Sequence, residues 1–214
     1  MLRSLRGSLR AGLVIFLLLV VSTGLVYPLV VTGLAQLFFP HQANGSLIRQ
    51  DGKVVGSSLI GQYFDKPQYF WDRPSATSPV PYDAENSGAS NLGPNNPELI
   101  KHVRERIQVL QKADPQAKGP IPVDLVTSSG SGLDPDISVA AALYQVPRVA
   151  HAGGISETTM RQLVRDNTTG PFLGLIGEPT VNVLKLNLAL HDRYVADKTH
   201  GQPASKPGRG LRES

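Results

Sequence analysis

The stretch AGLVIFLLLVVSTGLVYPLVV, residues 11–31, decides the architecture of this chain because it contains no charged side chain. As a helix rising 1.5 Å per residue it would be about 31 Å long, close to the roughly 30 Å hydrocarbon core of a bilayer. A cleaved signal peptide is the alternative reading, but its apolar region normally covers only about 7–15 residues. The sequence therefore predicts an uncleaved transmembrane helix over residues 11–33.

The basic residues around this helix predict its orientation. Arg3, Arg6 and Arg10 precede it, whereas the next Lys or Arg along the chain is Arg49. Positive charge collects on the cytoplasmic side of membrane helices. We therefore expect residues 1–10 in the cytoplasm and the chain from residue 34 onward outside.

Composition excludes several classes of function. The net charge is +4, but the basic residues crowd the two ends of the chain, and no basic stripe interleaved with aromatics indicates a nucleic-acid partner. The chain has no cysteine, which excludes disulfides, thiol nucleophiles and cysteine-ligated metals. Hydrophobic residues make up 41%, enough to support a packed core.

Residues 34–192 alternate between strand and helix patterns, which predicts a mixed α/β (α+β) domain after the single transmembrane helix. Asp51-Gly52 separates two short apolar runs, a pattern typical of a β-hairpin. Asn96 and Ser156 each precede a first turn with an acidic residue, so both are predicted N-caps of helices.

The sequence Asp134-Pro135-Asp136 has the same cap pattern and predicts a helix from Asp134 to about Val146. Pro147 should then stop or kink that helix. Residues 121–127, IPVDLVT, are predicted to form the strand that precedes it.

The C-terminal part of the chain gives weaker signals. Residues 181–183 predict a strand, but the apolar spacing of residues 184–190 fits either a strand or a helix. After Asp192 the chain becomes polar, so residues 193–214 are predicted to be a disordered tail.

A long loop rich in Pro, Asn, Ser and Gly follows the hairpin and contains a run of aromatic side chains. Tyr69, Phe70, Trp71 and Arg73 are candidates for a surface that binds a partner, since long loops inside compact domains are usually functional. The alternative is that the rings fix the loop to its own core.

The stretch TSSGSGLDPDIS, residues 127–138, looks like an active site but lacks its chemistry. Ser129 and Ser131 do not fit the G-x-S-x-G elbow, and no histidine pattern supplies a base. Asp134 and Asp136 are explained by the start of a helix, so no metal site is predicted. No catalytic residue is assigned, although an anchored serine hydrolase and a free-standing envelope binding protein stay open as alternatives.

Seven blocks in fixed order resemble one known family, the C subunit of the bacterial Kdp potassium-transporting P-type ATPase. The resemblance extends from the apolar helix to Asp192. The blocks are YPLVVTGLAQLFFPHQANGSLI, GKVVGSSLIGQYF, YFWDRPSAT, SGASNLGPNNPEL, DLVTSSGSGLDPDIS, YQVPRVA and VNVLKLNLALHD.

This resemblance implies a non-catalytic subunit of the bacterial inner membrane, anchored by one helix with its domain outside. The implied partners are a channel-like potassium-binding subunit (KdpA), a P-type ATPase subunit (KdpB), a small one-helix subunit (KdpF) and membrane lipid. It also implies a chaperone-like increase in the pump subunit's ATP affinity, with ATP bound only through the complex and Gln145 as a candidate nucleotide contact. Gly153 stands where the family tends to carry an arginine, so no role is implied for that charge.

Overall fold

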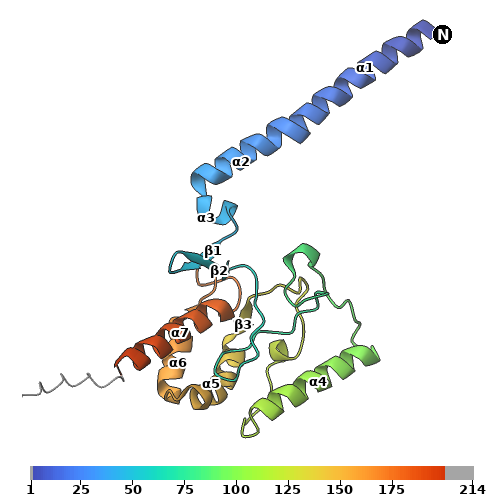
Figure 1. Ribbon diagram of the computed structural model, residues 1–214. Coiled ribbons are helices and arrows are strands. Elements are labelled where there is room, and N and C mark those ends of the chain that lie inside the picture. The colour runs from blue at the N-terminus through green and yellow to red at the C-terminus, as the bar shows by residue number, and fades with distance from the viewer. Residues whose placement is uncertain (1, 201–214) are drawn as a thin grey trace, which may run out of the picture. The chain divides into compact units, whose positions relative to one another are not determined.

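A computed structural model describes residues 2–200 of the chain, with side chains for residues 7–196. The described residues form two compact units that divide after Ser57. The first consists of a long helix and a β-hairpin, and the second of helices around a small sheet (Figure 1). A single apolar helix followed by a mixed helix and sheet domain confirms the predicted fold class.

The first unit begins with an almost continuous apolar helix. Its parts are α1 (Leu2–Val21), a π-helical turn η1 (Ser22–Val26) and α2 (Tyr27–Phe38). The π-helical turn ends two residues before Pro28, whose missing N–H and bulky ring disturb the hydrogen bonding of the preceding turn. Gly7–Phe38 has a mean hydropathy of 2.6 and is long and apolar enough to cross a membrane.

A short helix α3 (Pro40–Ala43) connects the apolar helix to the hairpin of β1 (Leu47–Gln50) and β2 (Lys53–Ser57). The strands are antiparallel, and Gln50 lies opposite Lys53. Asp51 and Gly52 have positive φ angles of 50° and 76°, as a two-residue hairpin turn requires. The predicted hairpin is confirmed.

The second unit packs four α-helices and short 3₁₀ turns around a small antiparallel sheet. Its elements are η2 (Ala84–Asn86), α4 (Pro97–Ala113), η3 (Val123–Leu125), β3 (Asp136–Ser138), α5 (Val139–Gly153), α6 (Glu157–Asp166), β4 (Thr168–Thr169), β5 (Thr180–Asn182) and α7 (Val183–His200). The strand order is β3-β5-β4, so the central strand comes last in the sequence. Asn96 and Ser156 cap α4 and α6 as predicted, each accepting a backbone N–H bond.

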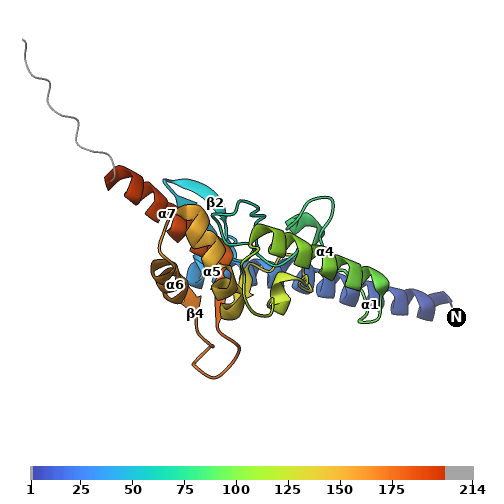
Figure 2. The ribbon, with the colours of Figure 1, turned by 90° about the horizontal axis from the view of Figure 1, so that it is seen from below.

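The core of this unit lies between the sheet and helices α5, α6 and α7, which lie together in both ribbon views (Figures 1 and 2). On α7, Val183, Leu186 and Leu190 follow helical spacing and are fully buried. The ambiguous apolar run of residues 184–190 is therefore helical.

The predicted helix start at Asp134 is wrong. Asp136–Ser138 pairs with β5 as β3, and the Val183 N–H donates to the carbonyl of Pro135. These tertiary hydrogen bonds hold the backbone extended where the local pattern favoured a helix. The N-cap of α5 is Ser138, whose side chain accepts from the Ala141 N–H at 3.0 Å.

The predicted strand over residues 121–127 is wrong, and of the two outcomes predicted at Pro147, a stop or a kink of the helix, the stop is wrong. Residues 121–127 contain the 3₁₀ helix η3 and no strand, because the carbonyls of Pro122 and Val123 accept turn hydrogen bonds from Leu125 and Val126. Pro147 does not end α5, which continues to Gly153 and ends at Gly154, with a left-handed φ of 68°. Burial of Val146 and Val149 on both sides of the proline stabilises the helix against its missing hydrogen bond.

Helix α7 also corrects the predicted tail. It continues to His200, so residues 193–200 are helical and not disordered. The rest of the predicted tail, residues 201–214, lies outside the described residues.

Gly153 has no room for a side chain. A Cβ at this position would clash with the phenol oxygen of Tyr194 and lie 2.8 Å from two of its ring carbons. Tyr194 comes from α7 and is fixed in place by a 3.0 Å hydrogen bond from its hydroxyl to the carbonyl of Gln68. The glycine therefore allows the C-terminal end of α5 to approach α7 closely.

We predict that Gly153→Ala destabilises the protein by about 1–3 kcal/mol through overpacking, although alanine has a higher helix propensity than glycine. Denaturant unfolding of the full chain in detergent measures this, with the single tryptophan, Trp71, as fluorescent reporter. Gly153→Ala should cost less in a Tyr194→Phe background, which lacks the clashing oxygen. Equal costs in the two backgrounds would contradict the proposed clash.

Candidate functional site

The segment Tyr69–Arg73, called here the YFWDR segment, has its three middle residues inside the second unit and its two end residues half-buried. Phe70, Trp71 and Asp72 are 0%, 7% and 4% exposed. The prediction that Phe70 and Trp71 form a partner-binding surface is therefore wrong, and the alternative, rings that fix the loop to its own core, is what the structure has. Tyr69 is half-buried, and its hydroxyl lies 3.0 Å from Nδ1 of His191.

Two side-chain amides hold the backbone of this segment, in an arrangement called here the amide clamp. Asn187 of α7 accepts from the Phe70 N–H at 2.9 Å and donates to the Phe70 carbonyl at 2.9 Å. Gln145 of α5 does the same for Trp71, at 2.8 Å and 3.0 Å. Both amides are 2% exposed. The clamp supplies the hydrogen bonds that a neighbouring strand would otherwise provide.

Trp71 also contacts two arginines, Arg148, which is buried, and Arg106, which is half-buried. The guanidinium carbons of Arg148 and Arg106 are 4.2 Å and 5.6 Å from the centre of its ring. Both distances are within the range of a cation–π interaction. Arg148 donates to the carbonyls of Pro67 and Tyr69, and Arg106 donates to those of Leu125 and Asp72. Loss of hydration lowers the pKa of Arg106 and lowers that of Arg148 to about 10, so Arg148 remains charged at neutral pH.

Gln145 is fully engaged in this arrangement. Its Oε1 accepts from Trp71 and, at 2.7 Å, from Arg148, while its Nε2 donates to Trp71 and at 3.3 Å to the carbonyl of Ala141. A nucleotide contact at Gln145 stays a prediction, and it would require these hydrogen bonds to be exchanged. The geometry assigns the amide a structural role.

Arg73 is at the other end of the segment, and its side chain is also paired within the second unit. Its guanidinium makes a 2.8 Å ion pair with Asp134, and its carbonyl accepts from the Tyr82 hydroxyl at 2.6 Å. Asp134 in turn accepts from the Asp136 N–H at 3.1 Å. The aspartate that the sequence assigned to a helix cap thus shapes a turn before β3 and connects it to the YFWDR segment.

Asp72 is a buried carboxyl group with incomplete hydrogen bonding. Its Oδ1 accepts from the Arg73 N–H at 2.8 Å, but Oδ2 has no hydrogen-bond partner among the described residues. The side chain lines a cavity of about 170 Å³ together with Tyr82 and Arg106. Burial raises the pKa of Asp72 to about 8, with the nearby carboxylates of Asp134 and Asp136 adding to the shift.

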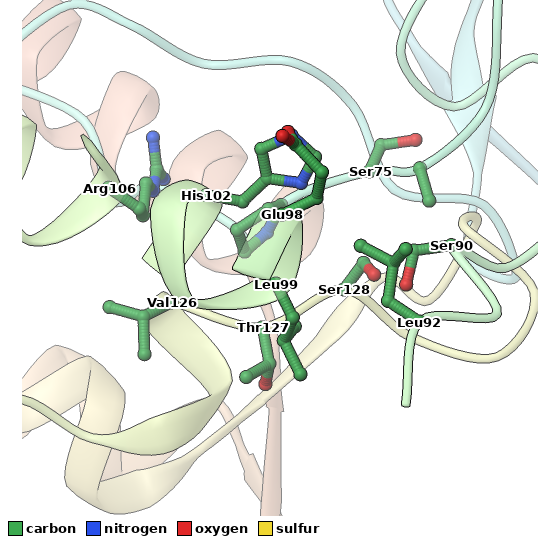
Figure 3. Close-up of a pocket in the computed structure, with 12 residues that line it drawn as sticks. Ser75, Ser90, Leu92, Glu98, Leu99, His102, Arg106, Val126, Thr127 and Ser128 are labelled. Carbon is green, nitrogen blue, oxygen red and sulfur yellow. The ribbon is translucent and has the colours of Figure 1, made fainter. Parts of the chain in front are cut away.

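A larger groove, of about 480 Å³, lies beside α4 (Figure 3). Glu98, Leu99, His102 and Arg106 of α4 line one side, and the rest of its wall comes from three loops. Those loop residues are Pro74, Ser75, Ala76, Ser90, Leu92, Val126, Thr127 and Ser128. Ser129 and Ser131 are not part of this wall. The groove combines apolar walls with hydroxyls and contains no paired nucleophile and base.

The serine-rich loop has a structural use. Ser129 Oγ accepts from the Gly132 N–H at 2.9 Å, and Ser131 Oγ accepts from the Leu133 N–H at 3.1 Å. Neither hydroxyl is hydrogen-bonded to a histidine, and a serine nucleophile needs such a base. Within the described part of the chain, no cluster of three or more His, Asp or Glu side chains could hold a metal ion.

Comparison with known proteins assigns the chain to a family. The profile of the family described as "KdpC: K+-transporting ATPase, c chain" matches residues 9–192. The chain belongs to this family. It is 60% identical over 182 residues to the potassium-transporting ATPase KdpC subunit of Sorangium cellulosum (strain So ce56), covering 85% of this chain and 96% of that relative.

Relatives in Burkholderia have the same name. The chain is 57% identical over 186 residues to the proteins of Burkholderia mallei (strain SAVP1) and Burkholderia pseudomallei (strain K96243). These matches cover 87% of this chain and 96% of each relative. The family resemblance inferred from the seven sequence blocks is confirmed.

Sequence reasoning missed Asn187, Arg106 and Arg148 as organisers of this region. One available signal was Asn187 itself, a polar residue inside the apolar run of residues 184–190. A polar side chain on a buried helical face needs a hydrogen-bond partner, which indicates a contact with backbone elsewhere in the fold. The arginines gave no such signal, because their periodicity fits an exposed helical face equally well.

We predict that Gln145→Leu destabilises the chain by about 1–3 kcal/mol, because it leaves the buried N–H and C=O of Trp71 without partners. Denaturant unfolding monitored by Trp71 fluorescence measures the loss. Gln111→Leu, an equivalent change at an exposed position of α4, is the matched control and should change stability little. Equal effects of the two substitutions would contradict the clamp.

Asp72 should make stability depend on pH. Between its unfolded pKa near 3.8 and its folded pKa near 8, the folded state keeps a proton that the unfolded state loses, so stability should fall as pH rises through this window. Asp72→Asn should flatten this fall. Unfolding midpoints at pH 5 and pH 8 test the difference, and an identical slope in the variant would exclude Asp72 as the cause.

Proposed function

We propose that the chain is a non-catalytic accessory subunit of an ATP-driven, high-affinity potassium-uptake complex. The observation that carries the proposal is the family match over residues 9–192, together with relatives named as subunits of a potassium-transporting ATPase. The internal structure supports a non-catalytic role. The buried polar groups around the YFWDR segment mostly bind backbone, and the serine loop lacks a base.

The apolar helix would anchor this subunit in the bacterial inner membrane. Its 32-residue apolar stretch exceeds the roughly 20 residues that a membrane crossing needs. Arg3, Arg6 and Arg10 at its start support a cytoplasmic N-terminus, which leaves the second unit outside. In this topology the second unit meets the external face of the complex and membrane lipid.

We propose three protein partners on this basis: the channel-like potassium-binding subunit, the P-type ATPase subunit and the small one-helix subunit. The second unit would stabilise their assembly. Any increase in the ATP affinity of the pump subunit would act through the complex, because Gln145 is buried and engaged, and ATP is on the opposite side of the membrane.

Co-expression with the other ATPase subunits tests the proposal. A chain that ends after Gln42 keeps the apolar helix but lacks the hairpin and the second unit. It should lose potassium-dependent ATPase activity and recover less of the complex in mild detergent than the full chain does. Full activity with the truncated chain would reject the proposal.

The matched control is the full chain with Ser129→Ala and Ser131→Ala. A hydrolase would lose its activity with these hydroxyls, whereas an accessory subunit that still folds should support ATPase activity. Loss of ATPase activity in a double variant that still folds would contradict the accessory role and favour the hydrolase alternative.

A further inference from the structure

The loop between β4 and β5 exposes a dense group of large apolar side chains. Phe172, Leu173, Leu175 and Ile176 are 70%, 79%, 87% and 67% exposed. We call residues 172–176 the apolar tip. In Figure 2 the orange loop that carries it projects beyond α5 and α6. Four large apolar residues among five consecutive positions are far more than the scattered exposure that is normal for a protein surface.

Other exposed apolar side chains of the second unit are spread along the chain. They are Leu59, Tyr63, Val80, Ile100, Val109, Val123 and Val195. None of them has another large exposed apolar residue as its sequence neighbour. The apolar tip is therefore a distinct feature of this unit, and contiguous exposed apolar surface usually marks an interaction site.

The apolar tip has a defined backbone conformation. The N–H of Phe172 donates to the carbonyl of Ile176 at 2.8 Å, and the N–H of Ile176 donates back to Phe172 at 3.1 Å. Gly174 donates to Pro171 at 2.9 Å. The loop thus closes on itself without using its side chains, which leaves them directed outward and preorganised for binding.

Leu173 adds a second sign that the conformation has a use. Its φ angle is +53°, a region that bulky residues rarely adopt. Such strain is typical of binding and functional loops. At 79% exposure, Leu173 gains little from packing inside this unit, so internal packing does not explain the strain.

Charge decides what kind of partner fits. Residues 168–180 contain no Lys or Arg, and Glu178 is their one charged residue. They contain no Trp or Tyr either. Membrane-surface segments normally combine apolar side chains with basic residues that attract anionic lipid, and with interfacial Trp or Tyr. This loop has neither feature, so its composition favours an apolar recess in a protein over a lipid surface.

We infer that the apolar tip inserts into an uncharged, apolar recess on another protein subunit of the transport complex. This inference rests on the proposed function, which supplies the partner. The preorganised apolar tip would act as the central, desolvated anchor of that interface, and the polar residues around it would form the rim.

Co-purification of the complex tests the anchor. Leu173→Asn/Leu175→Ser removes two exposed leucines, and asparagine tolerates the positive φ at position 173. Recovery of partner subunits in mild detergent should fall by roughly tenfold or more, the loss expected for truncated anchor residues. The control Val80→Ser/Val123→Ser removes two exposed valines elsewhere in the unit and should recover the complex normally.

The results of this co-purification distinguish a failure of the anchor inference from a failure of the proposed function. If the full chain recovers the complex and both double variants do so equally well, the apolar tip is not the anchor, and the proposed function stands. If the unaltered chain recovers no partner subunit, the proposed function and the inference fail together. The thermal unfolding midpoint of the tip variant should equal that of the unaltered chain, since its leucines are exposed.

A fluorescent label distinguishes protein from lipid. Because the chain has no cysteine, Leu175→Cys provides one site for a polarity-sensitive probe. The probe should report water when the chain is alone in lipid nanodiscs and an apolar environment in the assembled complex. An apolar environment in nanodiscs without partners would overturn the inference in favour of membrane binding, and an aqueous probe in the complex would also overturn it.

Discussion

The second unit depends on the two amides that hold the backbone of Phe70 and Trp71. A segment buried without a neighbouring strand must still satisfy its N–H and C=O groups, since each unpaired group costs free energy. Asn187 and Gln145 satisfy four of these groups from two different helices. In doing so they fix α5 and α7 against the same short segment. The amide clamp therefore supplies the backbone hydrogen bonds that a neighbouring strand would supply in a sheet.

The clamp also explains how Arg148 can be buried and Arg106 half-buried here. Each guanidinium faces the ring of Trp71 and donates to backbone carbonyls, and neither is in an ion pair within the described residues. A carbonyl accepts such a bond at a lower cost in conformational entropy when the backbone that carries it is already fixed. Fixing the YFWDR segment therefore positions the acceptors for both charges, and one of those acceptors, Gln145 Oε1, belongs to the clamp itself.

The elements that were predictable from sequence are those that local chemistry determines. The Asp51-Gly52 turn and the caps at Asn96 and Ser156 need only neighbouring residues, and all three appear as predicted. Predictions failed where distant residues decide. Residues 136–138 are extended because β5 pairs with them, and α5 passes Pro147 because both sides of that turn are buried. For Trp71 the sequence left a partner surface and a core position both open, because nothing near it in sequence indicates the partners from α5 and α7.

The distances along the chain between clamp partners have a consequence for how the unit forms. Trp71 is held by a residue 74 positions later, and Phe70 by one 117 positions later. During synthesis from the N-terminus, the aromatic segment therefore emerges long before the helices that bind it. Folding dominated by such distant contacts is slow, because a long loop must close before the contacts form. Until α5 and α7 are made, Trp71 and Phe70 lack the amides that bind them. The nascent unit is therefore prone to aggregation or to binding by a chaperone.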